Sequence, residues 1–85
     1  MLRPDYGEAH NNLAVLLHLR GELDEAERHY LDALEARPDD PEAHYNFGLL
    51  LRARGDEEGA WRAFATASEL APDVATFRSA LEAPR

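Results

Sequence analysis

The sequence predicts an all-α fold: a solenoid of antiparallel helix–turn–helix units, with about five helices in 85 residues. Residues 7–40 and 41–74 align without a gap and are identical at 14 of 34 positions, whereas chance would give about three or four. Apolar residues in both units recur at spacings of three, four and seven, which is the pattern of a helix face rather than a strand. Gly and Pro stand at equivalent places in the two units and divide them into helices.

The first unit is predicted to contain helices near residues 6–20 and 23–36. Leu13, Leu16 and Leu17 form the apolar stripe of the first helix, and Gly21 fits the left-handed residue that often follows a helix end. The second helix has its stripe at positions 23, 26, 30, 33 and 34. Pro38, followed by an Asp, then predicts a helix end and a new N-cap.

The second unit repeats this pattern, with helices expected near 41–54 and 57–70. Phe47, Leu50 and Leu51 form the stripe of its first helix, and Gly55 takes the place of the first glycine. A final helix over about 73–82 is expected to cover the last apolar face, as capping helices do in solenoids. We therefore expect one domain over residues 1–85.

The start of the chain is less regular than the two units. Residues 2–4, Leu-Arg-Pro, are similar to the tail of a preceding unit. Two units and a cap are below the usual minimum of about three repeats. The sequence therefore predicts either a piece of a longer array or a chain whose first helix face is protected by self-association.

The order of small and aromatic residues in each unit resembles the tetratricopeptide repeat family. The resemblance covers residues 7–74, and it implies a right-handed α-solenoid whose A helices, 6–20 and 41–54, line a concave groove for a protein ligand. One departure is that His10 and His44 stand where the family usually has Trp. The positions that carry the resemblance are Leu13 and Phe47, Ala14 and Gly48, Ala26 and Ala60, Tyr30 and Phe64, Ala33 and Ala67, and Pro38 and Pro72.

Charge and composition exclude several classes of function. Nine basic and 17 acidic residues give a net charge of −8, which disfavours nucleic acid and anionic membrane surfaces as partners. No apolar run reaches the roughly 18 residues of a membrane span. The absence of Cys excludes disulfides, thiolate metal sites and Cys nucleophiles, and it suits a cytoplasmic protein. The absence of Lys and Ile is typical of GC-rich coding, and we expect a bacterial source.

No group of residues predicts catalysis. The paired acids lie at expected helix starts, where carboxylates are favoured by the helix dipole. The sequence has neither a Gly-x-Ser-x-Gly elbow nor a glycine-rich phosphate loop. We therefore expect no enzymatic activity and no cofactor.

The histidines and the single Trp are predicted to be structural. His10 and His44 are expected to stack across the repeats in place of packing aromatics, and His29 is expected on the outer face of its helix. A metal site needs three or four converging ligands, and none is predicted. Trp61 is expected to be partly buried against the final helix, with an exposed anchor for a partner as the alternative.

The resemblance implies that the ligand lies along the A helices. Asn12 and Asn46 occupy the same place in successive units, which resembles the asparagine ladder of protein O-GlcNAc transferases. A carboxamide both donates and accepts, so two in register could hold an extended peptide backbone. The predicted peptide-binding residues are Asn11, Asn12, Val15, Tyr45, Asn46, Leu49 and Arg52.

The acidic residues of this surface predict the charge of the ligand. Glu8 and Glu42 on the A helices should repel an acidic tail, so we expect a neutral or basic ligand. The predicted function is a protein-interaction module with a scaffold or adaptor role and an affinity of about micromolar. The alternative is a structural spacer or self-association segment of a longer protein.

Overall fold

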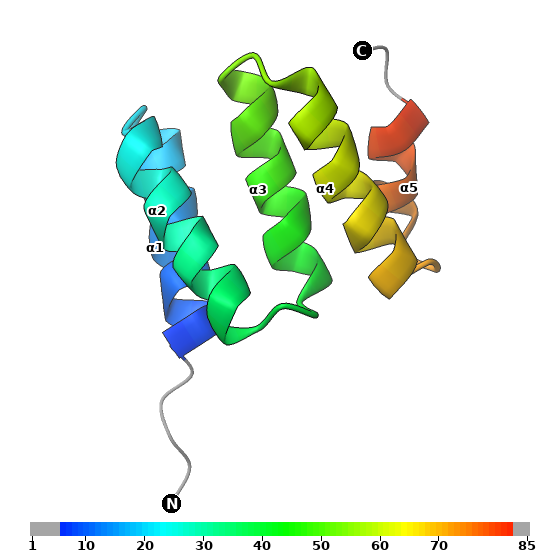
Figure 1. Ribbon diagram of the computed structural model, residues 1–85, viewed down its shortest axis with the longest axis horizontal. Helices are drawn as coiled ribbons and strands as arrows, with labels where there is room; N and C mark the ends of the chain where they lie inside the picture. Colours follow the sequence, from blue (N-terminus) through cyan, green and yellow to red (C-terminus); the bar gives the residue numbers. More distant parts are fainter. Residues whose placement is uncertain (1–5, 83–85) are drawn as a thin grey trace, which may run out of the picture.

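The computed structural model describes residues 6–82, and every element in that range is an α-helix (Figure 1). Each of the five predicted helices is present, with ends within two residues of those expected. The helices are α1 (Tyr6–Leu19), α2 (Leu23–Ala36), α3 (Pro41–Ala53), α4 (Glu57–Leu70) and α5 (Ala75–Glu82).

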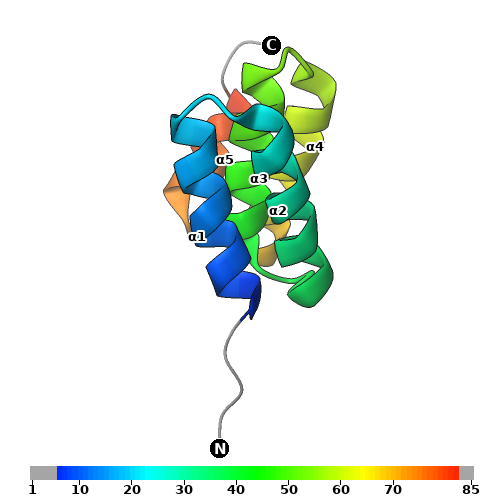
Figure 2. The ribbon, with the colours of Figure 1, turned by 90° about the vertical axis from the view of Figure 1, so that its left-hand side faces the viewer.

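The helices stack in chain order as antiparallel neighbours. The two tightest pairs are α1 with α2 and α3 with α4, while α5 packs on α4. Smaller contacts join α2 and α1 to α3. Figure 2 shows α1 and α5 on one side of the molecule and α2 and α4 on the other, with α3 between them in this view.

The same type of turn connects the two helices of each pair. Gly21 and Gly55 have φ of 81° and 89°, the left-handed region predicted for them from the sequence. The Gly21 amide donates to the carbonyl of His18 and the next amide to that of Leu17, both at 2.9 Å. The same two bonds recur 34 residues later, so both turns are Schellman motifs that satisfy the carbonyls of the helix end.

The helix starts are capped unequally. Asp40 accepts a hydrogen bond from the Glu42 amide at 3.1 Å, with Pro41 in the first turn of α3. Asp56 accepts from the Gly59 amide at 2.9 Å and so caps α4. Glu22 stands at the equivalent place before α2, but its side chain makes no capping bond.

The core depends on small residues between the helices of each pair. Ala26 and Ala60 are fully buried, which lets the paired helices approach closely, and the rings of Tyr30 and Phe64 fill the space beside them. At Gly48 a Cβ would lie 2.6 Å from the Phe64 ring, so even Ala would crowd this contact. Burial raises the pKa of Tyr30 to about 12, because the phenolate cannot be solvated there.

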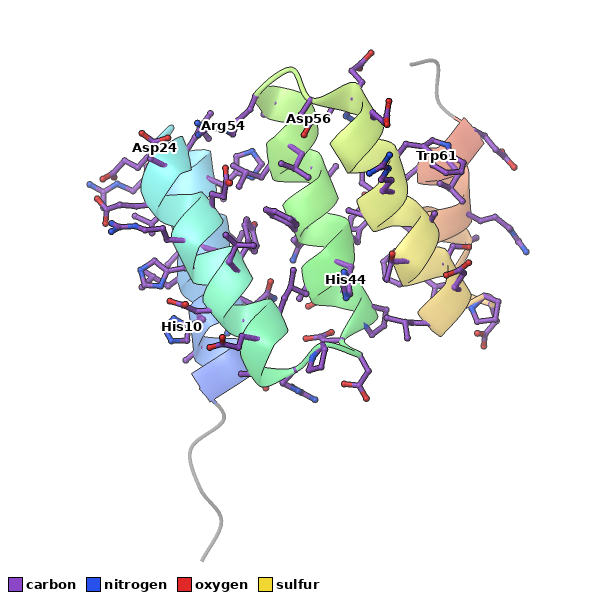
Figure 3. All side chains as sticks on the ribbon, in the orientation of Figure 1. His10, Asp24, His44, Arg54, Asp56 and Trp61 are labelled. Carbon is purple, nitrogen blue, oxygen red and sulfur yellow. The ribbon has the colours of Figure 1, made fainter. Side chains whose placement is uncertain are left out.

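The interface between the two pairs combines apolar and charged contacts. Tyr30 on α2 meets the Phe47 ring on α3 at 6.1 Å between centroids, and the buried Leu50 joins the same cluster. At the edge, Arg54 pairs with Asp24 at 2.8 Å and with Glu27 at 3.5 Å (Figure 3). Because these ions are partly exposed, they orient the stack more than they stabilise it.

Candidate peptide-binding surface

The predicted peptide-binding residues lie on α1 and α3, two neighbouring helices that contact each other. We call the seven residues the α1/α3 set. It consists of Asn11, Asn12 and Val15 on α1 and of Tyr45, Asn46, Leu49 and Arg52 on α3.

The asparagines are paired differently from the predicted register. Asn46 donates from Nδ2 to Oδ1 of Asn11 at 3.4 Å, a long hydrogen bond between α3 and α1. Asn11 is only 4% exposed, whereas Asn12 is exposed. Consecutive helical residues point about 100° apart, so α1 can turn only one of its two asparagines toward α3. Among the residues that the structure describes, the Asn12 side chain has no hydrogen-bond partner.

Tyr45 and Arg52 are both anchored on the same ring. The Tyr45 ring lies 5.6 Å from that of Phe64 on α4 and 5.2 Å from that of Phe77 on α5. The Arg52 guanidinium stands 5.4 Å from the centre of the Phe64 ring, a cation–π contact at the exposed end of α3. Tyr45 thus helps to hold α5, and only the part of its surface that stays accessible can meet a ligand.

The apolar members of the set are half-buried. Val15 packs against the core cluster, and Leu49 has similar burial on α3. Leu19, which follows on α1, is 78% exposed. The carboxylates of Glu8 and Glu42 lie in exposed residues at the start of the same two helices, so the surface is acidic at one end.

The histidines correct two expectations. His10 does not stack on His44: its ring stacks on His29 of α2, with centroids 5.1 Å apart and the two Nδ1 atoms 2.9 Å apart. His44 instead meets the carbonyl oxygen of Pro38 with Nε2 at 2.8 Å. Figure 3 shows His10 and His44 well apart on their separate helices. His29 is therefore half-buried against α1 rather than simply on an outer face.

The carboxylate of Asp32, a third possible metal ligand, lies beside His10 and His29. One possible metal-ligand atom from each of His10, His29 and Asp32 lies within 4.8 Å of the other two. Sequence reasoning missed the cluster because it considered the histidines without the acid. The available signal was the spacing of His29 and Asp32, which puts them one turn apart on a helix that packs on α1.

Trp61 remains partly accessible on α4, with 37% of its surface exposed (Figure 3). Within residues 6–82, no helix is long and apolar enough to cross a membrane.

Stacked antiparallel helix pairs with this internal period define a helical-repeat protein. A sequence model described as a tetratricopeptide repeat matches residues 16–51, from the middle of α1 through α2 and most of α3. No curated protein matches the chain. The match covers 36 of the 85 residues, and together with the five-helix architecture it is consistent with the tetratricopeptide repeat family.

This family is in general a non-catalytic fold that mediates protein–protein interactions. The matched residues overlap both predicted units without following their boundaries, so the division at 7–40 and 41–74 stays a prediction.

Proposed function

We propose that this chain binds an extended peptide across α1 and α3 as the docking module of a scaffold or adaptor. One observation carries the proposal. Among the described residues, Asn12 is exposed without a hydrogen-bond partner, and Asn46 on α3, which contacts α1, makes only one long bond. Each carboxamide therefore keeps donors and an acceptor for the amide and carbonyl of a peptide backbone.

The other members of the α1/α3 set have supporting roles. Asn11 holds the Asn46 amide in place from within the helix interface, since it is buried and bonded to it. Val15, Leu49 and the accessible edge of Tyr45 contact apolar side chains of the ligand. Arg52 provides one cationic group, kept near the surface by its contact with the Phe64 ring.

The ligand that suits this surface is neutral or basic. Exposed Glu8 and Glu42 and a net charge of −8 favour the approach of cationic segments and oppose acidic tails. Nucleic acids are not expected partners for the same reason. A short peptide that contacts two A helices should bind with a Kd of about micromolar.

The test is binding to an unbiased peptide array, followed by titration of the selected peptide in solution. The double variant Asn12→Ala with Asn46→Ala should lose at least about tenfold in affinity, since two amide contacts disappear. The control is Thr66→Ala with Ser68→Ala on α4, on the opposite side of the molecule from α1 (Figure 2), which changes no charge and should bind like the native chain. Equal affinity of the folded asparagine variant and the native chain would contradict the proposal.

A second candidate function is assembly, either with another copy or with further repeats. It is favoured by Leu13 and Leu16 on α1, which are 42% and 59% exposed although their counterparts Phe47 and Leu50 pack in the core. An apolar helix face with this exposure can be covered by a neighbour.

Sedimentation at increasing concentration tests this alternative. Assembly through α1 predicts a mass that rises with concentration in the native chain and stays monomeric in Leu13→Glu with Leu16→Glu. A native chain that stays monomeric up to about millimolar concentration would exclude self-association as strong as the proposed peptide affinity.

A further inference from the structure

We propose that His10, His29 and Asp32 bind a divalent transition-metal ion of the Zn²⁺ class, which joins α1 to α2. The inference is independent of the proposed peptide binding. It starts from the cluster described above, in which one ligand atom from each of the three residues lies within 4.8 Å of the others.

The distances are close to those that a bound ion requires. Zn²⁺ binds imidazole nitrogen and carboxylate oxygen at about 2.0–2.2 Å, so ligand atoms around a tetrahedral ion are about 3.3 Å apart. The two Nδ1 atoms are 2.9 Å apart and need to separate by about 0.4 Å. Asp32 is exposed, so its carboxylate can close the remaining gap of about 1.5 Å at most by turning its side chain.

The three ligands also come from supports that already hold them together. α1 and α2 form one of the two tightest helix pairs, and His29 and Asp32 lie one turn apart on α2. The His10 and His29 rings are half-buried and stacked at an interplanar angle of 27°. Rotation about the broad χ2 torsion of each ring can direct both lone pairs to one ion. The ion would then replace the single proton that the two facing nitrogens share.

The chemistry of the donors defines the class of ion. Two imidazoles and a carboxylate suit Zn²⁺, Co²⁺, Ni²⁺ or Cu²⁺, whereas Mg²⁺ and Ca²⁺ prefer oxygen ligands alone. Three protein ligands leave at least one position for water. The net charge of −8 raises the local concentration of cations around the chain.

The second helix pair provides an internal control. His44 stands where His10 does, 34 residues further on, but Ala63 and Thr66 replace His29 and Asp32. His44 makes its contact with the Pro38 carbonyl instead. His44 therefore has no counterparts of His29 and Asp32 on α4 and cannot form a three-ligand site. His44→Ala removes the same side chain as His10→Ala but leaves the cluster intact, which makes it the matched control.

The experiment titrates ZnCl₂ into the full chain, prepared without a polyhistidine tag, and measures heat of binding and Tm. We expect one ion per chain and a Tm that rises by about 10–20 °C when free Zn²⁺ is about 100 times its Kd. His44→Ala should give the same rise. His10→Ala and Asp32→Asn should each weaken Zn²⁺ binding at least about tenfold, and MgCl₂ should have no effect.

Residue-resolved NMR of the imidazole rings gives a second readout that does not depend on a substitution. Zn²⁺ should shift the ring resonances of His10 and His29 and leave those of His18 and His44 unchanged. If His10→Ala fails to fold, Asp32→Asn decides the outcome together with the ring shifts, because Asp32 is exposed. Absence of saturable binding up to about 1 mM Zn²⁺, equal binding by folded Asp32→Asn, or shifts centred on His18 or His44 would each overturn the proposal.

Discussion

The first and second helix pairs carry the same pattern of residues in different surroundings. Leu50 on α3 is fully buried, because α2 covers it and Tyr30 packs in the same cluster. Leu16, its counterpart on α1, is 59% exposed, since α1 has no equivalent neighbour among the described residues. Burial at this position therefore depends on which helix stacks against it and not on the local sequence, as expected for a solenoid.

The largest expected effect tests what the two pairs have in common. Ala26→Leu and Ala60→Leu should each lower stability by about 3 kcal/mol or more, because a larger side chain forces the paired helices apart at a site without free space. For 85 residues with about 4–13 kcal/mol in total, that change removes about a quarter or more of the stability and should lower Tm by more than about 10 °C. Thermal unfolding followed by circular dichroism measures it, and an unchanged Tm in both variants would refute this packing scheme.

The next prediction tests the difference between the pairs. Leu50→Ala should destabilise the chain by about 2–5 kcal/mol, since it leaves a cavity between α2 and α3. Leu16→Ala should change stability by less than about 0.5 kcal/mol. Urea unfolding of both variants gives the comparison. A large effect of Leu16→Ala that grows with protein concentration would show that another molecule covers α1, which would favour the assembly function.

The pairs also differ at the central aromatic, which is Tyr30 in the first and Phe64 in the second. Because burial raises the pKa of Tyr30 from 10 to about 12, the folded state keeps the phenol proton at a pH where the unfolded chain loses it. The contribution of the Tyr30 phenol to the free energy of unfolding is complete below pH 10 and is lost as pH rises toward 12. The loss is about 2 kcal/mol at pH 11.5.

Urea unfolding at pH 9 and pH 11.5 checks this dependence against Tyr30→Phe. The variant has Phe at this position, as the second pair does. It should therefore not show the loss of stability at high pH that is due to Tyr30. If native and variant chains lose the same stability over this interval, Tyr30 is not the group responsible.

The features that the sequence predicted well are those set by spacing along one chain segment. The helix ends follow from Gly21, Gly55 and Pro38, because a left-handed glycine or a proline acts within one turn. The period of 34 also predicted which small residues would be buried, since Ala26 and Ala60 lie on the apolar stripes.

The features that sequence reasoning missed depend on rotation between helices. Whether Asn11 or Asn12 meets Asn46 depends on how α1 is turned toward α3, and the stripe of apolar residues fixes that angle only within one position. The stacking of His10 on His29 likewise depends on where α2 crosses α1. An unaligned sequence gives the faces of single helices but not the pairs of side chains that meet between them.

The smallest expected effect concerns the helix starts. Asp56 caps α4 through the Gly59 amide, whereas Glu22 before α2 makes no capping bond and pairs with Arg20 at 3.1 Å instead. The longer Glu side chain is a poorer N-cap than Asp. Asp56→Ala should therefore cost about 1 kcal/mol, and Glu22→Ala only a few tenths, since its ion pair is exposed.

The reciprocal variant Glu22→Asp should give α2 the cap that α4 has and raise stability by about 0.5–1 kcal/mol. Amide hydrogen exchange in the first turn of each helix can separate these local changes from the global one. Equal losses from Asp56→Ala and Glu22→Ala would mean that the capping bond does not distinguish the two pairs.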